Sequence, residues 1–185
     1  MRTIAIEGIN GSGKSPAIDL IVQRSSKVGI FAKAYAPYHL VREKIDEPDI
    51  YPLWRERPCE AVKLLHETIA EIEADARDQR LDLLIFDRHW LTAYTQAERN
   101  PCIAELWGDT FVPTILFTSP LEHTLRLSQR GYTMSWLQAE NLTNYLELYE
   151  TLYQRHRQLF IGKFTVSSST QNLSPIADQI ISIAT

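Results

Sequence analysis

Apolar residues gather along this chain in short runs that alternate with longer amphipathic stretches. Two of the runs, "LLIF" and "TILF", are apolar at every position, which is typical of strands buried on both faces of a parallel sheet. Together the runs predict five strands, at residues 3–6, 29–35, 83–86, 114–117 and 163–166.

Helical spacing fills much of the chain between these runs. Apolar residues three and four apart predict a helix from about residue 59 to 80, and the same spacing returns between residues 142 and 159. Ser135, with Gln138 three residues later, resembles a capping box that would begin the second helix. Residues 174–184 predict a short final helix.

Alternating strands and helices predict the α/β class, with a three-layer fold in which helices cover both faces of a five-stranded parallel sheet. Residues 46–58 carry three prolines and interrupt the pattern, so we expect a loop there, near the functional site. A length of 185 residues suits a single domain spanning residues 1–185.

Composition narrows the classes of partner. The net charge of −4, from 19 basic and 23 acidic residues, argues against a nucleic-acid or membrane-surface partner. The chain has neither an 18-residue apolar run nor a signal-like N-terminus, and we expect a cytoplasmic protein. The two cysteines, Cys59 and Cys102, form no C-x-x-C pair, so we expect two reduced thiols rather than a disulfide or a zinc site.

The strongest chemical signal is the pattern G-x-x-x-x-G-K-S at residues 8–15, placed between a predicted strand and a predicted helix. Glycines let successive main-chain N–H groups point at phosphate oxygens, and the N-terminus of the helix adds positive potential. Lys14 would reach the β- and γ-phosphates and the Ser15 hydroxyl would bind Mg²⁺. The predicted nucleotide contacts are Gly8, Asn10, Gly11, Ser12, Gly13, Lys14 and Ser15.

Pro16 follows this loop directly and has no main-chain N–H. Proline is tolerated in a first helical turn, but one phosphate donor is lost. A charge-assisted hydrogen bond is worth about 1.5–3 kcal/mol, so we expect nucleotide affinity weaker by one to two decades.

Asp87 and Arg88 end the apolar run at residues 83–86. Ligands of open α/β sheets sit at the carboxyl ends of the strands. A carboxylate there suits Mg²⁺, bound directly or through one of its ligands, and a neighbouring arginine suits the phosphate of an acceptor.

These motifs resemble those of the thymidylate kinases and, more broadly, of the P-loop nucleoside and nucleotide kinases. "IAIEGINGSGKS" looks like the family's E-G-x-[DE]-G-x-G-K-[ST] loop. "DRHWLTAYTQ" is similar to its D-R-[YH]-x-x-S motif, with Thr92 at the serine position. "VPTILFTSPLEHTLRLSQRG" and "FTVSSSTQNLSPIADQI" resemble its arginine helix and its closing segment, so the likeness spans nearly the whole chain.

The resemblance implies transfer of a phosphoryl group from ATP to a nucleoside monophosphate, with Mg²⁺ as cofactor. It implies that Asp87 lies near the metal and that Arg88 binds the acceptor phosphate. Arg126 and Arg130 would lie near the donor nucleotide and a lid at about residues 131–141. The family likeness also implies a homodimer.

The chain departs from the family mainly on the acceptor side. Asn10 replaces an acidic residue that contacts the acceptor sugar, and Ala36 replaces the glutamate that serves as base in the related deoxynucleoside kinases. Residues 132–141 contain no Lys or Arg. His66 falls where thymidylate kinases place an arginine facing the base, and either a substrate contact or a histidine at the edge of the core fits its position.

Thr92 and Tyr94 are further candidates for contact with the acceptor, Tyr94 through its ring.

The motifs, with their departures from the family, leave three functions open. The first is a kinase of the thymidylate-kinase type, the second a deoxynucleoside kinase, and the third a nucleotide-binding protein with little or no transfer activity. A P-loop hydrolase or switch fits the sequence less well.

Overall fold

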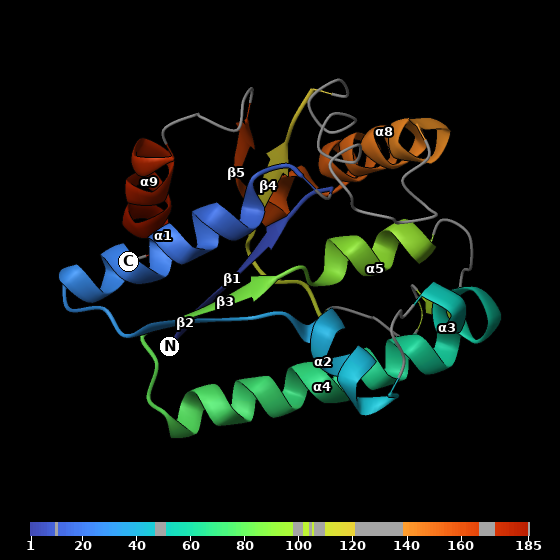
Figure 1. Ribbon diagram of the computed structural model, residues 1–185, viewed down its shortest axis with the longest axis horizontal. Helices are drawn as coiled ribbons and strands as arrows, with labels where there is room; N and C mark the ends of the chain where they lie inside the picture. Colours follow the sequence, from blue (N-terminus) through green and yellow to red (C-terminus); the bar gives the residue numbers. More distant parts are fainter. Residues whose placement is uncertain are drawn as a thin grey trace.

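A five-stranded parallel sheet forms the centre of the molecule (Figure 1). The computed structural model describes residues 1–9, 11–46, 51–97, 102–103, 105, 110–120, 139–166 and 173–184. The strand order is β2-β3-β1-β4-β5, which confirms the predicted class and number of strands. The strands are β1 (Arg2–Glu7), β2 (Ala32–Tyr35), β3 (Leu83–Asp87), β4 (Thr114–Thr118) and β5 (Phe160–Thr165).

The central strands are buried on both faces, as their continuous apolar runs predict. In β1, Ile4 and Ile6 join one hydrophobic cluster and Ala5 joins the other, because successive side chains of a strand point to opposite faces. In the same way Leu84 and Ile85 of β3 are fully buried in different clusters. The sheet therefore separates two cores, one on each face.

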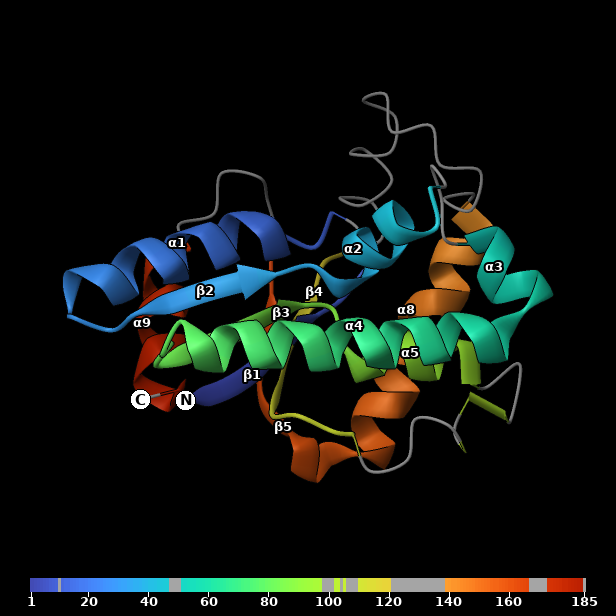
Figure 2. The same ribbon diagram turned by 90° about the horizontal axis from the view of Figure 1, so that it is seen from below.

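Helices cover both faces of the sheet (Figure 2). One face packs against α1 (Lys14–Lys27) and α9 (Ser174–Ala184), which also contact each other. The other face is covered by α2 (Pro37–Lys44), α3 (Tyr51–Glu56), α4 (Pro58–Asp78), α5 (Trp90–Ala97) and α8 (Ala139–Arg155). A short 3-10 turn, η1 (Arg157–Leu159), leads into β5. No helix among the described residues is long and apolar enough to cross a membrane.

The loop predicted at residues 46–58 is wrong in part, because α3 occupies its centre. Leu53 and Trp54 are buried in the core beside α4. Tertiary packing therefore stabilises a helix in a segment whose three prolines indicate a loop. At β2 the strand begins three residues later than predicted, because Gly29 closes α1 in a left-handed conformation (φ 78°). The capping box expected at Ser135 lies outside the described residues.

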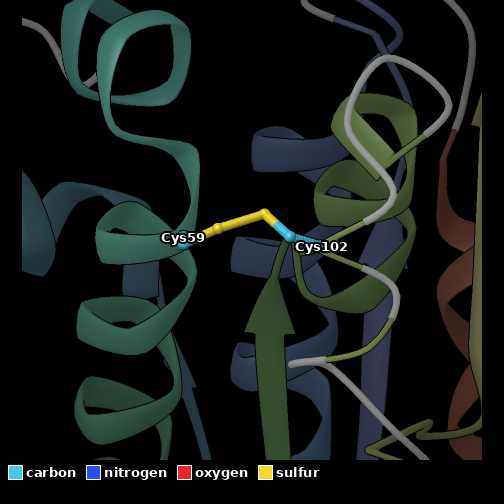
Figure 3. Close-up of a disulfide and its surroundings, with 2 residues drawn as sticks. All are labelled: Cys59 and Cys102. Carbon is cyan, nitrogen blue, oxygen red and sulfur yellow. A yellow bond between two sulfur atoms is a disulfide. The ribbon is translucent and has the colours of Figure 1, made fainter.

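The expectation of two reduced thiols is also wrong, because Cys59 and Cys102 form a disulfide (Figure 3). Cys59 lies in the first turn of α4, and Cys102 lies in the chain beyond α5. The two Cα atoms are 6.4 Å apart although the residues are 43 positions apart in the sequence. The fold brings the start of α4 beside this segment, and the spacing of cysteines carries no record of such tertiary proximity.

Candidate active site

The predicted chemical residues meet at the carboxyl edge of the sheet. Ile6 of β1 lies opposite Asp87 of β3 in the parallel ladder, so the segments that follow these two strands leave the sheet side by side. The first becomes the glycine loop and α1, and the second carries Arg88 into α5. The C-terminal edge of a parallel sheet is where ligands of such folds bind.

The loop after β1 has the backbone that a phosphate cradle needs. Gly8, Gly11 and Gly13 all have positive φ, of 141°, 78° and 87°. A Cβ atom on Gly8 would lie 2.1 Å from the carbonyl oxygen of Phe117, so only glycine fits between β1 and β4 at this point. Gly13 stands at the N-cap of α1, with no side chain covering the helix N-terminus from that position.

Lys14 is the first residue of α1 and is buried. Its Nζ donates a hydrogen bond to the carbonyl oxygen of Ile9 across the loop, at 2.9 Å. The pKa of Lys14 is lowered to about 7, first by burial and then by the nearby Arg88 cation, whereas the carboxylates of Asp87 and Glu7 act in the opposite direction. An incoming anion would restore the ordinary charge of this lysine.

The first turn of α1 accommodates Pro16 without breaking the helix. The N–H of Ala17 still reaches the carbonyl oxygen of Gly13, at 3.3 Å, so the helical ladder starts normally. Ser15 is exposed at the mouth of the loop, whereas Ser12 is fully buried. The Ser12 hydroxyl has no hydrogen-bond partner among the described residues.

Asp87 supplies an oxygen that fits a metal or a polar ligand. Its Oδ1 is buried and has no hydrogen-bond partner within the described ranges. The Ser15 hydroxyl and a carboxylate oxygen are the hard ligands that Mg²⁺ accepts alongside phosphate oxygens and water. No group of three or more His, Cys, Asp and Glu side chains gathers among the described residues.

Arg88 sits in a backbone conformation that is rare for a residue with a side chain, with φ of 72°. Its N–H donates to the carbonyl oxygen of Ile6 at 3.0 Å and so joins the end of β1. Its guanidinium Nη1 lies 3.3 Å from the Thr92 hydroxyl and 3.3 Å from the hydroxyl of Tyr149, which comes from α8.

Glu7 is a site residue that the sequence reasoning missed. Its carboxylate is fully buried, and Oε1 accepts main-chain N–H groups of His89 (2.6 Å), Leu91 (3.0 Å) and Thr92 (3.2 Å). The Thr92 hydroxyl donates to Oε2 at 2.6 Å. Burial raises the pKa of Glu7, although these hydrogen bonds and Arg88 oppose the shift. The sequence signal that could have indicated Glu7 is an acidic residue at the end of an otherwise apolar strand.

The acceptor-side candidates are dispersed. Thr92 lies against Arg88, but the ring of Tyr94 packs among those of Trp90, Phe111 and His156, where packing accounts for it. His66 on α4 is half-buried, and burial lowers its pKa.

His89 is fully buried, and its pKa falls to about 3, first through burial and then through the neighbouring His66. Asn10, Arg126 and Arg130 lie outside the described residues, as do lid residues 131–138, so their predicted roles stay predictions.

Comparisons match the chain to solved structures of kinases. A thymidylate kinase from Candida albicans aligns with a TM-score of 0.64 at 16% identity, covering 98% of this chain and 90% of that chain. A shikimate kinase from Acinetobacter baumannii, in complex with shikimate, aligns with a TM-score of 0.61 at 15% identity, covering 99% and 92%. One from Bacteroides thetaiotaomicron aligns at 0.59 and 12% identity, covering 97% and 96%. No family model and no curated protein matches the sequence. The chain has the α/β P-loop kinase fold.

Proposed function

We propose that this protein is an ATP- and Mg²⁺-dependent phosphotransferase acting on a small-molecule acceptor, with a nucleoside monophosphate as the leading candidate. One arrangement carries the proposal. The glycine loop delivers Lys14 to the start of α1, while the neighbouring strand β3 delivers Asp87 and Arg88 to the same edge of the sheet. A cradle for phosphates and a second cationic group stand side by side.

The chain's own residues divide the work between donor and acceptor. Main-chain N–H groups of the loop and Lys14 would hold the donor phosphates, and Ser15 and Asp87 would hold Mg²⁺. Bound ATP supplies the phosphoryl group to be transferred. Arg88 would orient the acceptor and stabilise the charge that develops during transfer, so catalysis rests on positioning and electrostatics.

Geometry favours a phosphate acceptor over a hydroxyl acceptor. A monophosphate oxygen is already ionised near pH 7, whereas a hydroxyl group needs a base. Glu7 is not suited to that role, because its carboxylate is buried and bound by Leu91, Thr92 and His89. Asp87 would have to serve as both metal ligand and base. Hydroxyl acceptors, including deoxynucleosides and the shikimate named for one structural neighbour, are therefore the second choice.

The test is a coupled assay of ADP formation with a panel of nucleoside monophosphates, deoxynucleosides and shikimate, each with Mg-ATP. We expect one acceptor to raise turnover well above the background rate. Lys14→Ala should abolish this turnover, whereas Thr68→Val should leave it unchanged. Thr68 is a matched buried control on α4, because its hydroxyl has no hydrogen-bond partner among the described residues. Turnover that no acceptor raises would refute phosphotransfer.

A nucleotide-binding protein without transfer activity is the second candidate. Pro16 removes one donor from the first turn of α1, and the sequence of residues 132–141 offers no lysine or arginine. An arginine that stabilises the transferring phosphoryl group is worth about 10³–10⁵ in rate, so its loss can silence transfer while leaving binding intact. Calorimetry showing ADP bound by the wild type and not by Lys14→Ala, without turnover for any acceptor, would select this candidate.

A further inference from the structure

Three side chains from three separate parts of the chain converge on one hydroxyl group. The Thr92 Oγ1 lies 2.6 Å from Glu7 Oε2, 3.3 Å from Arg88 Nη1 and 3.0 Å from the hydroxyl of Tyr149. Glu7 ends β1, Arg88 joins β3 to α5, and Tyr149 belongs to α8. Tyr149 is also 3.3 Å from Arg88 Nη1, so the four groups form one hydrogen-bonded network.

The direction of each hydrogen bond in this set follows from the chemistry of its members. Arginine only donates, so both Thr92 and Tyr149 must accept from Arg88. Oε1 of Glu7 already accepts three main-chain N–H groups, which favours the ionised carboxylate and leaves Oε2 to accept the Thr92 hydrogen. Thr92 then has one lone pair left, and Tyr149 must donate to it.

This assignment gives every member a defined orientation. The Thr92 hydroxyl uses its single hydrogen and both lone pairs, so removal of any one partner leaves it incompletely bonded. Two neutral hydroxyl oxygens accept hydrogen bonds from Arg88 Nη1 and orient the guanidinium, and the buried Glu7 carboxylate interacts with its charge. A charge oriented in this way is suited to an anionic ligand.

The backbone around Arg88 depends on the same set. Its left-handed φ of 72° is unfavourable for a residue with a Cβ and persists only where surrounding bonds enforce it. Glu7 stabilises this conformation of Arg88, because its Oε1 accepts hydrogen bonds from the N–H groups of His89, Leu91 and Thr92, which follow Arg88 in the chain.

We propose that Thr92 and Tyr149, anchored by Glu7, are positioning residues that orient the Arg88 guanidinium to bind the phosphate group of the acceptor. The inference rests on the proposed phosphotransfer, and it adds which residues fix the orientation of the Arg88 guanidinium. Because Tyr149 belongs to α8, the orientation of Arg88 depends on the packing of that helix against α5.

The kinetic test compares isosteric variants with a conservative one. We expect Thr92→Val and Tyr149→Phe each to raise the acceptor KM about tenfold, with a smaller change in kcat. Thr92→Ser keeps the hydroxyl and should restore the KM. Tyr153→Phe removes a hydroxyl one turn further along α8, where the ring packs on Phe160, and should leave the KM unchanged. The Kd for ADP should not change in any variant, because the glycine loop is untouched.

A second measurement does not depend on turnover. In protein labelled with ¹⁵N-arginine, the Arg88 guanidinium resonances are identified by their loss in Arg88→Lys. We expect them to report slow rotation in the wild type and in Thr92→Ser, and fast rotation in Thr92→Val and Tyr149→Phe. A Thr92→Val protein that keeps slow rotation or an unchanged acceptor KM overturns the positioning role. If no acceptor is turned over but the rotation changes as expected, the proposed function fails and the orientation of Arg88 stands.

Discussion

We expect the buried lysine of the glycine loop to make nucleotide binding at the proposed site depend on pH. Lys14 has a pKa of about 7 because it is buried, so close to half of the protein carries this charge at neutral pH. A polyphosphate placed beside Nζ favours the charged form and should raise the pKa toward its ordinary value of about 10.5. Binding above pH 7 is therefore coupled to uptake of one proton.

The direction and the size of the change in Kd with pH follow from this shift in the pKa of Lys14. Below pH 7 Lys14 is charged before and after binding, and its contribution does not vary. Above pH 7 the charged fraction of the free protein falls tenfold for each pH unit, and the affinity falls with it. With a pKa of about 7, the charged fraction drops from about 0.24 at pH 7.5 to about 0.03 at pH 8.5. We therefore expect the Kd for Mg-ADP to rise roughly eightfold over that interval.

Isothermal titration calorimetry with Mg-ADP between pH 7.5 and 8.5 measures this effect. Two buffers with different ionisation enthalpies should reveal an uptake approaching one proton per nucleotide at the upper end. The terminal phosphate, with a pKa of about 6, is almost fully ionised throughout and adds no slope of its own. Lys14→Met should bind weakly with a Kd that does not vary with pH. A wild-type Kd that stays flat, or an equal slope in Lys14→Met, would refute the assignment to this lysine.

Three further predictions address the loop and the disulfide. Pro16→Ser restores a donor in the first turn of α1 and should lower the Kd for Mg-ADP about tenfold or more, measured by the same calorimetry. Gly8→Ala should destabilise the fold by about 3 kcal/mol or more in urea unfolding, because its Cβ would lie 2.1 Å from a carbonyl oxygen of β4. Gly29→Ala, also at positive φ but with no atom within 4 Å, should cost only about 1 kcal/mol. Cys59→Ser should lose about 4 kcal/mol of stability, since the bond to Cys102 closes a 43-residue separation. A reducing agent should weaken the wild type equally and leave the serine variant unchanged.

The sequence predicts the sheet well because burial on both faces leaves a direct record in it. "LLIF" and "TILF" are apolar throughout, and both became central strands with residues fully buried on opposite faces. The final helix was predicted with the bounds that the structure shows, Ser174–Ala184. The loop predicted at residues 51–56 is wrong for the opposite reason. Their prolines indicate a loop, and the contacts that make them helical come from α4 and the core, which local sequence does not record.

In the candidate site, too, some residues can be predicted from the sequence and others only from the fold. A motif names residues whose side chains or N–H groups would touch the ligand, and on that basis the sequence predicts Lys14 and Asp87 as site residues. Glu7 acts on groups 82 to 85 positions away, so its role exists only once β1 and the start of α5 are neighbours. Its burial is unfavourable for a carboxylate unless several donors surround it, and those donors are the N–H groups that follow Arg88. The buried acid and the left-handed arginine therefore stabilise each other. Replacing Glu7 should therefore disturb the conformation of Arg88 more than that of the glycine loop.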